Sequence, residues 1–424
     1  MTDIIDDLTW RGLIAMSTDL DDLRKALDGG RMTFYAGFDP TGPGLHIGHL
    51  ALLLTVRRLQ LAGHRPVGLV GGATGLIGDP SGKSAERVLN PREVVAGWVQ
   101  RIRSEIGHYL DFDGPAAALL VSNLDWTESL STLDFLRDIG KHFPVNQMLS
   151  RDVVRNRLES GGISFTEFSY QILQANDFLE LHRRYDCGLQ IGGSDQWGNL
   201  VSGVDLIRRV TGNSAHAMVI PLITKPDGTK YGKTAGEAVW LSPGLMSPYA
   251  FYQFWVNRSD AEVPGLLKVF TFRTRSEIEE LEREMAERPA ARQAQRTLAE
   301  DVTTLVHGPD ELRRVQAASR ALFGHGELAD LDAATLAAAI SEVPRAEVSG
   351  GGELPQIADL MARTGIVASK SAGRRAIAAG GAYLNNVKVT AEDAAPAAAD
   401  LLHGRFLVLR RGKRTVAGVE VSSR

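Results

Sequence analysis

The stretch YAGFDPTGPGLHIGH, residues 35–49, decides the fold of its surroundings. It begins as a short run of aromatic and small residues that is typical of a β-strand, and Pro and Gly then force a loop. The apolar run that follows, residues 50–59, predicts a buried helix. His46 and His49 therefore stand where a strand and a loop lead into a helix. Free N–H groups and the positive dipole end of a helix N-terminus can bind an anion there.

Two phosphate-binding patterns nearly match this part of the chain and fail. Gly42 and Gly44 would need a third glycine at position 47, where the chain has Ile47. Residues 82–84, GKS, look like the end of a phosphate-binding loop, but that pattern needs glycine where Ile77 stands. Taken alone, the two histidines are equally well explained as capping or core residues.

A second segment, KYGKT at residues 230–234, ends a polar stretch far downstream. By itself this segment is more typical of a solvated loop. Together, the histidine pair after a strand and two lysines on a later loop resemble the HIGH and KMSKS elements of class I aminoacyl-tRNA synthetases.

Four further motifs resemble the bacterial tyrosyl-tRNA synthetases in particular, in order along nearly the whole chain. They are YAGFDPT at 35–41, GDPSGK at 78–83, YQILQAND at 170–177 and GGSDQWGN at 192–199. The resemblance implies a tyrosine–tRNA ligase with ATP as substrate. Such an enzyme converts L-tyrosine and ATP to tyrosyl adenylate and pyrophosphate. It then transfers the tyrosyl group to the 3′-terminal adenosine of tRNA(Tyr).

The composition is that of an ordinary globular protein of two to four domains, with 424 residues, 44% apolar and 23% charged. The single cysteine, Cys187, excludes an internal disulfide and fits a reducing compartment. The acidic N-terminus carries no secretory pattern, and the longest apolar runs are too short to cross a bilayer. We expect a cytoplasmic location without a membrane partner.

Charge is unevenly distributed along the chain. Residues 355–424 contain 11 Lys and Arg against 5 Asp and Glu, so this part carries +6 and the remainder carries −10, for a net charge of −4. A basic tail on an acidic body favours a polyanion as partner of the tail. A solvated charged surface is the simpler alternative.

Coarse patterning predicts several domains. Residues 1–30 are typical of a helix, and 31–225 alternate apolar runs with amphipathic helices, which predicts an α/β fold with a doubly wound parallel sheet. The predicted catalytic domain covers residues 1–246, with an insertion at about 125–168. An α-helical domain that contacts tRNA follows at 247–345.

The rest of the chain predicts a small α+β domain. The Ser-Gly-rich stretch at 346–354 predicts a flexible linker. Beyond it, residues 355–424 predict two helices, a hairpin that turns at Asn385-Asn386, and a late strand at 405–410. This order resembles an RNA-binding domain found in a ribosomal protein. The candidate RNA-binding residues are Lys370, Arg374, Arg375, Lys388, Arg410 and Arg411.

The resemblance assigns a tyrosine pocket. A pocket that selects tyrosine needs polar groups that only the substrate hydroxyl satisfies, and Tyr35 and Asp177 match that role. Tyr170, Gln174 and Asp177 have helical spacing and lie on one face. A helix-end carboxylate is the alternative for Asp177. The family pattern gives Asp79, Tyr170 and Gln174 to the α-ammonium group and Gln196 to the activated carboxyl. Asn123, at a predicted strand end, either supports the pocket or forms an Asx-turn.

The same resemblance assigns an ATP site. His46, His49 and Thr41 line the triphosphate, and Lys230, Lys233 and Thr234 close over the pyrophosphate. Asp39 and Asp195 are candidates for ammonium or ribose contacts, while Gly37 and Gly193 allow a close approach to the adenylate. Mg2+ is expected to accompany ATP, and no structural metal is expected. Positioning and charge stabilisation supply the rate without a covalent enzyme intermediate.

The chain departs from the family pattern in two places. Ala36 stands where a cysteine near the ribose is common. In the lysine loop, Tyr231, Gly232 and Thr234 replace Met, Ser and Ser.

Two other functions compete with this interpretation. A tryptophanyl-tRNA synthetase has a similar fold, but its pocket must satisfy an indole N–H, which is only a donor. An RNA-binding protein built on a synthetase body would also explain the basic tail. A homodimer is expected through residues 143–168, with Phe143, Met148 and Phe165 at the interface, because their apolar side chains lack a partner in a minimal fold.

Overall fold

The structure is a computed structural model that describes residues 3–81, 90–224, 238–350 and 353–422. The chain divides into two compact units. Unit 1 contains residues 1–245 and 261–282, and unit 2 contains residues 246–260 and 283–424. The sequence predicts a single change of domain near residue 246. The chain instead leaves unit 1 there, returns for residues 261–282, and leaves again.

Unit 1 is built on a six-stranded sheet in the order β1-β6-β5-β2-β3-β4. Every neighbouring pair is parallel except β1 with β6. The strands are β1 (Met16–Ser17), β2 (Thr33–Phe38), β3 (Arg65–Val70), β4 (Leu119–Ser122), β5 (Cys187–Gly193) and β6 (His216–Ile220). The parallel, doubly wound sheet predicted from the sequence is confirmed.

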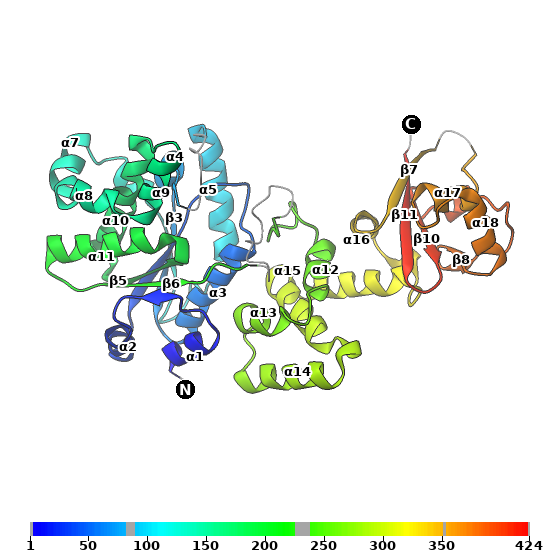
Figure 1. The fold of residues 1–424 in the computed structure, drawn as a ribbon, viewed down its shortest axis with the longest axis horizontal. Helices are drawn as coiled ribbons and strands as arrows, with labels where there is room; N and C mark the ends of the chain where they lie inside the picture. Colours follow the sequence, from blue (N-terminus) through cyan, green and yellow to red (C-terminus); the bar gives the residue numbers. More distant parts are fainter. Residues whose placement is uncertain (1–2, 82–89, 225–237, 351–352, 423–424) are drawn as a thin grey trace. The chain divides into compact units, whose positions relative to one another are not determined.

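Helices cover both faces of this sheet (Figure 1). On one face lie α3 (Ile47–Leu61) and α5 (Arg92–Gly107), and on the other α10 (Phe165–Tyr185) and α11 (Trp197–Thr211). The chain winds outward from β2 through β3 to β4, then crosses back to β5 and continues to β6. The direction reverses between β2 and β5, and ligands of open α/β sheets bind at the carboxyl ends of the strands beside such a switch point.

The sequence predicts a helix over the first 30 residues, and this prediction is wrong. They form α1 (Ile4–Trp10), β1 and α2 (Leu20–Asp28). The positive φ of Gly12 (72°) lies just beyond the end of α1, and Asp19 begins α2 by accepting the backbone N–H groups of Asp21 and Asp22. Shorter helices complete the unit: α4 (Thr74–Ile77), α6 (Leu124–Thr127), α7 (Thr132–Asp134), α8 (Val145–Leu149), α9 (Asp152–Ser160) and α13 (Val263–Phe270).

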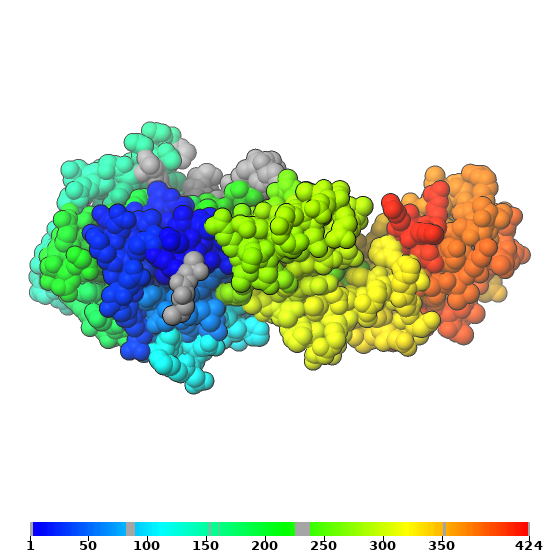
Figure 2. All heavy atoms as spheres, turned by 90° about the horizontal axis from the view of Figure 1, so that it is seen from below, coloured from blue at the N-terminus to red at the C-terminus, as the bar shows by residue number. Residues whose placement is uncertain are grey.

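Buried arginines fasten the returning segment 261–282 to the rest of unit 1. Arg11 donates to the carbonyl oxygens of Lys268, Thr271 and Arg273, and Arg58 on α3 also donates to that of Thr271, at 2.6 Å. In Figure 2 the blue N-terminal residues adjoin the yellow-green surface of this segment. The last carbonyl groups of α13 are thus satisfied by side chains from the N-terminal part of the unit.

Unit 2 combines helices with a second sheet. Its helices are α12 (Pro248–Val256), α15 (Gln293–Leu322), α16 (Ala333–Ser341), α17 (Ile357–Arg363) and α18 (Lys370–Ala378), while α14 (Arg275–Glu287) runs across the division between the units. α15 is kinked at Gly308, whose φ is 87°, with Pro309 next to it. The predicted hairpin is confirmed as β8 (Ala382–Leu384) and β9 (Val387–Lys388), with positive φ at Asn385 and Asn386.

The predicted flexible linker over residues 346–354 is wrong for its first part. Residues Arg345–Ser349 form β7, which pairs in parallel with β11 (Thr415–Ser422). The sheet order is β7-β11-β10-β8-β9, with β10 at Phe406–Arg411. The strand β11 was not predicted from the sequence. Residues 345–349 are extended because they pair with β11, and without knowledge of that strand the sequence does not predict it.

Candidate functional site

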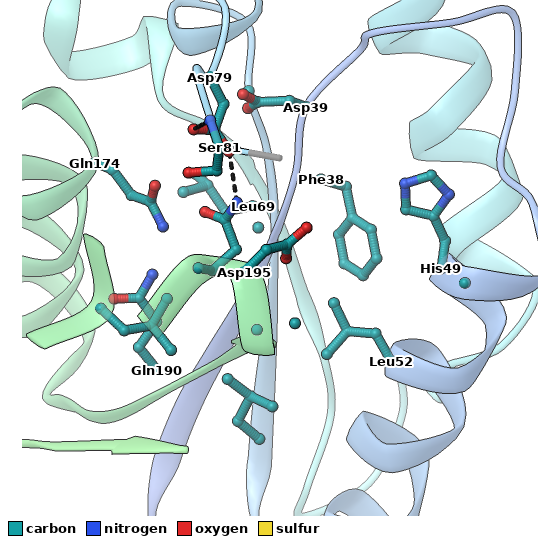
Figure 3. Close-up of a pocket in the computed structure, with 18 of the residues that line it drawn as sticks. Phe38, Asp39, His49, Leu52, Leu69, Asp79, Ser81, Gln174, Gln190 and Asp195 are labelled. Atoms are coloured by element: carbon teal, nitrogen blue, oxygen red, sulfur yellow. Dashed lines mark hydrogen bonds between the residues drawn. The ribbon is translucent and has the colours of Figure 1, made fainter. Parts of the chain in front are cut away.

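A cavity of about 610 Å3 opens at the carboxyl ends of β2 and β5, beside the switch point of the sheet. Thirteen of the residues predicted from the sequence line it: Tyr35, Gly37, Asp39, Thr41, His46, His49, Asp79, Tyr170, Gln174, Asp177, Gly193, Asp195 and Gln196. In Figure 3, His49 on α3 lies on one side of the cavity and Gln174 and Gln190 on the other, with three carboxylates between them.

The deep end of the cavity holds the buried carboxylate of Asp177. Asn123 Nδ2 donates to its Oδ2 at 2.9 Å, and Trp126 Nε1 donates to its Oδ1 at 2.9 Å. Asn123 also accepts the backbone N–H of Ala73 and donates to Thr74 Oγ1. Asn123 therefore supports the pocket from behind, as one of its two predicted roles requires.

Burial dominates the electrostatics at this end. It raises the pKa of Asp177 to about 7, although the bonds from Asn123 and Trp126 favour the charged form. Burial and the nearby Asp177 charge raise the pKa of Tyr35 well above its ordinary value. Tyr35 therefore keeps its phenolic proton at neutral pH.

Three buried side-chain oxygens in the cavity lining have no hydrogen-bond partner among the described residues. They are Tyr35 Oη, Gln174 Oε1 and Gln190 Oε1. A buried polar atom without a partner costs free energy, on the order of 1–3 kcal/mol. Three such atoms around one cavity fit a ligand that supplies the missing hydrogen-bond partners.

The middle of the cavity is a network of acids and amides. Tyr170 donates to Asp39 Oδ2 at 2.6 Å, and Thr74 donates to Asp39 Oδ1 at 2.6 Å. Gln196 donates to Asp79, whose other oxygen accepts the backbone N–H of Ser81. Carboxylates held in this way suit a cationic ligand group such as an ammonium.

The two histidines form a reciprocal cap at the N-terminus of α3. His46 Nδ1 accepts the N–H of Gly48 at 3.1 Å, and His49 Nδ1 accepts the N–H of His46 at 3.2 Å. Burial lowers the pKa of both imidazoles, and the nearby His46 lowers that of His49 further. Both rings are therefore neutral at pH 7 and carry their proton on Nε2, because Nδ1 acts as an acceptor. Each ring can donate that N–H to a phosphate oxygen.

Gly48 makes this cap possible. A Cβ atom at position 48 would lie 2.9 Å from His46 Cε1, closer than real Cβ atoms approach. Gly71 has a similar role at the network, because a Cβ there would overlap the carboxylate of Asp39. Glycines at these two positions let side chains close over the backbone.

Several residues of the site were not predicted from the sequence. Gln190 and Thr74 line the cavity, and Trp126 holds Asp177. A glutamine within the apolar run of β5 is a signal that could have identified Gln190. Phe38 and Leu52 add an apolar wall on the His49 side, and Leu69 also lines the cavity.

Other predicted residues lie elsewhere. Lys230, Lys233 and Thr234 fall outside the described residues. In unit 2, Lys370, Arg374, Arg375, Lys388 and Arg411 are exposed. Arg410 is half-buried, stacks 4.1 Å from the ring centroid of Tyr383 and donates to Gly412 O. Its guanidinium is therefore engaged within the unit.

The predicted dimer residues differ in exposure. Phe165 is 75% exposed and Phe143 is half-buried, whereas Met148 is only 3% exposed within the protomer. Further exposed apolar side chains lie between residues 133 and 158: Leu133, Leu136, Val145, Leu149 and Leu158. Among the described helices, none has the length and apolar character to cross a membrane.

Family models match the chain in two places. Residues 27–324 match tRNA synthetases class I (W and Y), and residues 335–417 match the tyrosine–tRNA ligase SYY-like C-terminal domain. Proteins named tyrosine–tRNA ligase align over nearly the full length of both chains. The one from Streptomyces coelicolor is 62% identical over 100% of each chain, and the one from Thermobifida fusca is 59% identical over 99% of each.

Solved structures agree with these matches. A C-terminally truncated mitochondrial tyrosyl-tRNA synthetase from Aspergillus nidulans is similar with a TM-score of 0.69 and 30% identity. The match covers 76% of this chain and 94% of that one. A tryptophanyl-tRNA synthetase from Encephalitozoon cuniculi shares the fold, with a TM-score of 0.53 at 14% identity over 73% of this chain and 86% of that one.

Proposed function

The chain belongs to the tyrosine–tRNA ligases, which are class I aminoacyl-tRNA synthetases. On this premise we propose that one end of its cavity binds tyrosine and the other end binds ATP. The deep end takes the phenol and ammonium of L-tyrosine. The end beside α3 takes the triphosphate of ATP. The observation that carries this division is that Gln174 and Gln190, whose side-chain oxygens have no partner among the described residues, lie across the cavity from His49 (Figure 3).

The tyrosine end is complementary to a phenol. The substrate hydroxyl forms hydrogen bonds with Tyr35 Oη and with the carboxylate of Asp177. Tyr35 is protonated and acts as donor or acceptor, while Asp177 is an acceptor when ionised. Gln190 Oε1 adds a further acceptor in the cavity lining. Phenylalanine would leave these groups unpaired, and that penalty selects tyrosine.

The ammonium end is complementary to a cation. Asp79, Tyr170 and Gln174 would receive the α-ammonium group, with Gln174 Oε1 as an acceptor that has no partner among the described residues. Gln196, fixed through its bond to Asp79, would then face the substrate carboxylate. Asp39 holds Tyr170 in place.

The chemistry is an in-line displacement at phosphorus. One oxygen of the tyrosine carboxylate forms a bond to the α-phosphorus of ATP as the bond from that phosphorus to pyrophosphate breaks. ATP enters as its Mg2+ complex. Negative charge grows on the leaving pyrophosphate, and the Nε2–H groups of His46 and His49, with Thr41, stabilise it. In this proposal the negative charge on pyrophosphate is also stabilised by Lys230, Lys233 and Thr234.

The second step uses tRNA(Tyr). A hydroxyl oxygen of its 3′-terminal adenosine forms an ester bond to the carbonyl carbon of tyrosyl adenylate. The bond from that carbon to the phosphate oxygen breaks, and AMP and the hydroxyl proton leave. Asp195 and Gly193 line the cavity, and we assign them, with Gly37, to the adenylate. Residues 355–424, with exposed basic side chains on α18, are proposed to hold the tRNA through its phosphates.

The enzyme is proposed to act as a cytoplasmic homodimer. Six large apolar side chains are exposed among the residues between 133 and 165 whose burial is described, and a second copy is a partner that would cover them. Met148 would support this surface from beneath, because it is itself buried.

The division of the cavity is tested by two variants. Gln174→Ala should weaken tyrosine binding about tenfold and leave the KM for ATP unchanged. His49→Ala should slow adenylate formation by at least about 10²-fold and leave the Kd for tyrosine unchanged. Equilibrium tyrosine binding and single-turnover kinetics measure both. A variant that changes both ends equally would contradict the division.

A further inference from the structure

Within the proposed function, we propose that Glu105 is a positioning residue for the ATP end of the cavity. Glu105 lies on α5, outside the cavity lining. Its carboxylate holds the backbone of Leu45, the residue that directly precedes the His46 cap. The inference rests on the assignment of His46 and Thr41 to the triphosphate.

The contact is short and aimed at the loop backbone. Leu45 N–H donates to Glu105 Oε2 at 2.7 Å. One helical turn earlier, Arg101 donates to the carbonyl oxygen of Pro43 at 2.7 Å. Two side chains of α5 therefore hydrogen-bond to two neighbouring peptide groups of the loop between Asp39 and His46. Three residues of this segment, Asp39, Thr41 and His46, line the cavity.

The next two peptide groups along the chain are held by residues 239–241. Leu241 N–H donates to Leu45 O at 2.9 Å, and Ile47 N–H donates to Val239 O at 3.0 Å. His46 and Trp240 form an isolated antiparallel bridge between these contacts. Leu45 is thus fixed at both its N–H and its C=O. Loss of the Glu105 contact would leave Leu45, directly before the first histidine, fixed at its C=O only.

Burying the carboxylate of Glu105 costs free energy, and this cost favours a functional reason for its position. Glu105 Oε1 is buried without a partner among the described residues. Burial raises the pKa of Glu105, against the lowering effects of the Leu45 N–H bond and of Arg101. Tyr109 also lies within the electrostatic reach of Glu105. A carboxylate that accepts a single N–H in a half-buried place contributes little net stability, but it fixes the position of that N–H.

Glycine at position 44 lets the carboxylate of Glu105 approach the loop closely. A Cβ there would lie 3.0 Å from Glu105 Oε1 and 3.0 Å from a methyl group of Leu245. The carboxylate thus packs directly against the loop backbone. Among the described residues, those that interact with this carboxylate include Leu45 and Arg101, which both lie outside the tyrosine end.

The test compares Glu105→Ala, Glu105→Gln and a control, Glu93→Ala, which removes an exposed acid from the same helix. We expect kcat/KM for ATP to fall by about 10- to 100-fold in Glu105→Ala, because a displaced reacting group loses its alignment. The Kd for tyrosine should stay within about twofold of the wild-type value, as expected for a site that acts on one substrate. Glu105→Gln keeps an acceptor for Leu45 N–H and should recover most of the activity. Glu93→Ala should behave as wild type.

Three results would overturn the proposal. They are a kcat/KM for ATP in Glu105→Ala within twofold of wild type, an equal loss in Glu105→Gln, and a parallel loss of tyrosine binding. If Glu105→Ala does not fold, Glu105→Asp replaces it, and its shorter side chain should give an intermediate loss. His49→Ala distinguishes failure of the positioning role from failure of the proposed ATP site. If it lowers the rate while Glu105→Ala does not, only the positioning role fails, and if neither changes the rate, the proposed ATP site fails.

Discussion

Trp126 donates its indole N–H to Asp177 at 2.9 Å, on the carboxylate oxygen opposite the one that Asn123 holds. Both oxygens of this buried acid are therefore oriented by donors that are fixed in the fold. The acid keeps acceptor capacity for a substrate hydroxyl, because each carboxylate oxygen has more than one lone pair. An acid in such a place has a protonation equilibrium that a bound phenol can shift.

Tyrosine binding should strengthen as pH rises from 6 to 8. The pKa of Asp177 is raised to about 7, and a phenol that donates to the ionised carboxylate lowers it. Binding therefore releases a proton, and the affinity should increase by about threefold or more over this range. Calorimetry in two buffers of different ionisation enthalpy measures the proton release. Phenylalanine, which has no hydroxyl, provides the control and should release none.

The raised pKa of Asp177 also predicts that the free enzyme becomes less stable as pH rises, whereas tyrosine binding becomes stronger. Between about pH 4 and 7 the folded protein binds a proton at Asp177 that the unfolded chain does not. The contribution of this group to the free energy of unfolding should therefore fall as pH rises through that range. Tyrosine affinity that is flat between pH 6 and 8 would contradict the role of Asp177.

Tyr35→Phe should weaken tyrosine binding about 5- to 10-fold without lowering the melting temperature. The hydroxyl that it removes has no partner among the described residues, so the free protein loses no hydrogen bond. Tyr170→Phe is the matched control. Its hydroxyl donates to Asp39 at 2.6 Å, so its loss should cost about 1–2 kcal/mol of stability. Equal destabilisation in both variants would mean that Tyr35 is bonded within the fold.

Gly48→Ala should lower kcat/KM for ATP by about tenfold or more, because the new Cβ would displace the His46 ring from its cap. Gly97→Ala, in the exposed middle of α5, meets no atom within 4 Å. That control should stabilise the protein by up to about 1 kcal/mol and leave the activity unchanged. Thermal unfolding and pyrophosphate-exchange kinetics measure both. Wild-type activity in Gly48→Ala would show that the cap is dispensable.

Lys233→Ala should slow adenylate formation by at least about 10²-fold with little change in tyrosine affinity. A lysine that meets charge appearing in the transition state affects the rate of activation more than ground-state binding. Single-turnover kinetics with saturating tyrosine measures this. A matching loss of tyrosine binding would indicate a structural role for the loop.

Removal of the C-terminal residues should separate activation from charging. Because β7 pairs with β11, a cut at Ser349 would leave an unpaired strand, so the chain should end near Glu342. The shortened protein should keep pyrophosphate exchange and charge tRNA(Tyr) poorly. The full-length protein should show tRNA affinity that falls steeply with salt. Undiminished charging by the shortened protein would remove the tail from the proposed tRNA contacts.

Much of the site could be predicted from local patterns. Pro and Gly placed the loop after β2, the apolar run placed α3, and spacings of four and three residues placed Tyr170, Gln174 and Asp177 on one face of α10. All three line the cavity. These features depend on neighbours within about two helical turns, and sequence periodicity reports such features directly.

The remainder depends on contacts between distant residues. Trp126 and Asp177 are 51 positions apart, and Leu45 and Glu105 are 60 apart, so no periodic pattern links them. β7 is extended because it pairs with β11, about 70 residues later. An isolated stretch of five residues before a glycine run carries no trace of that partner.

The most direct test of the account is amino-acid-dependent ATP–pyrophosphate exchange by the full-length enzyme, measured separately with tyrosine, phenylalanine and tryptophan. We predict exchange that depends on tyrosine, with phenylalanine and tryptophan at background. In Tyr35→Phe, the specificity constant for tyrosine should fall while that for phenylalanine does not. Comparable exchange with phenylalanine or tryptophan in the unaltered enzyme would contradict the assignment of Tyr35 and Asp177 to the substrate hydroxyl.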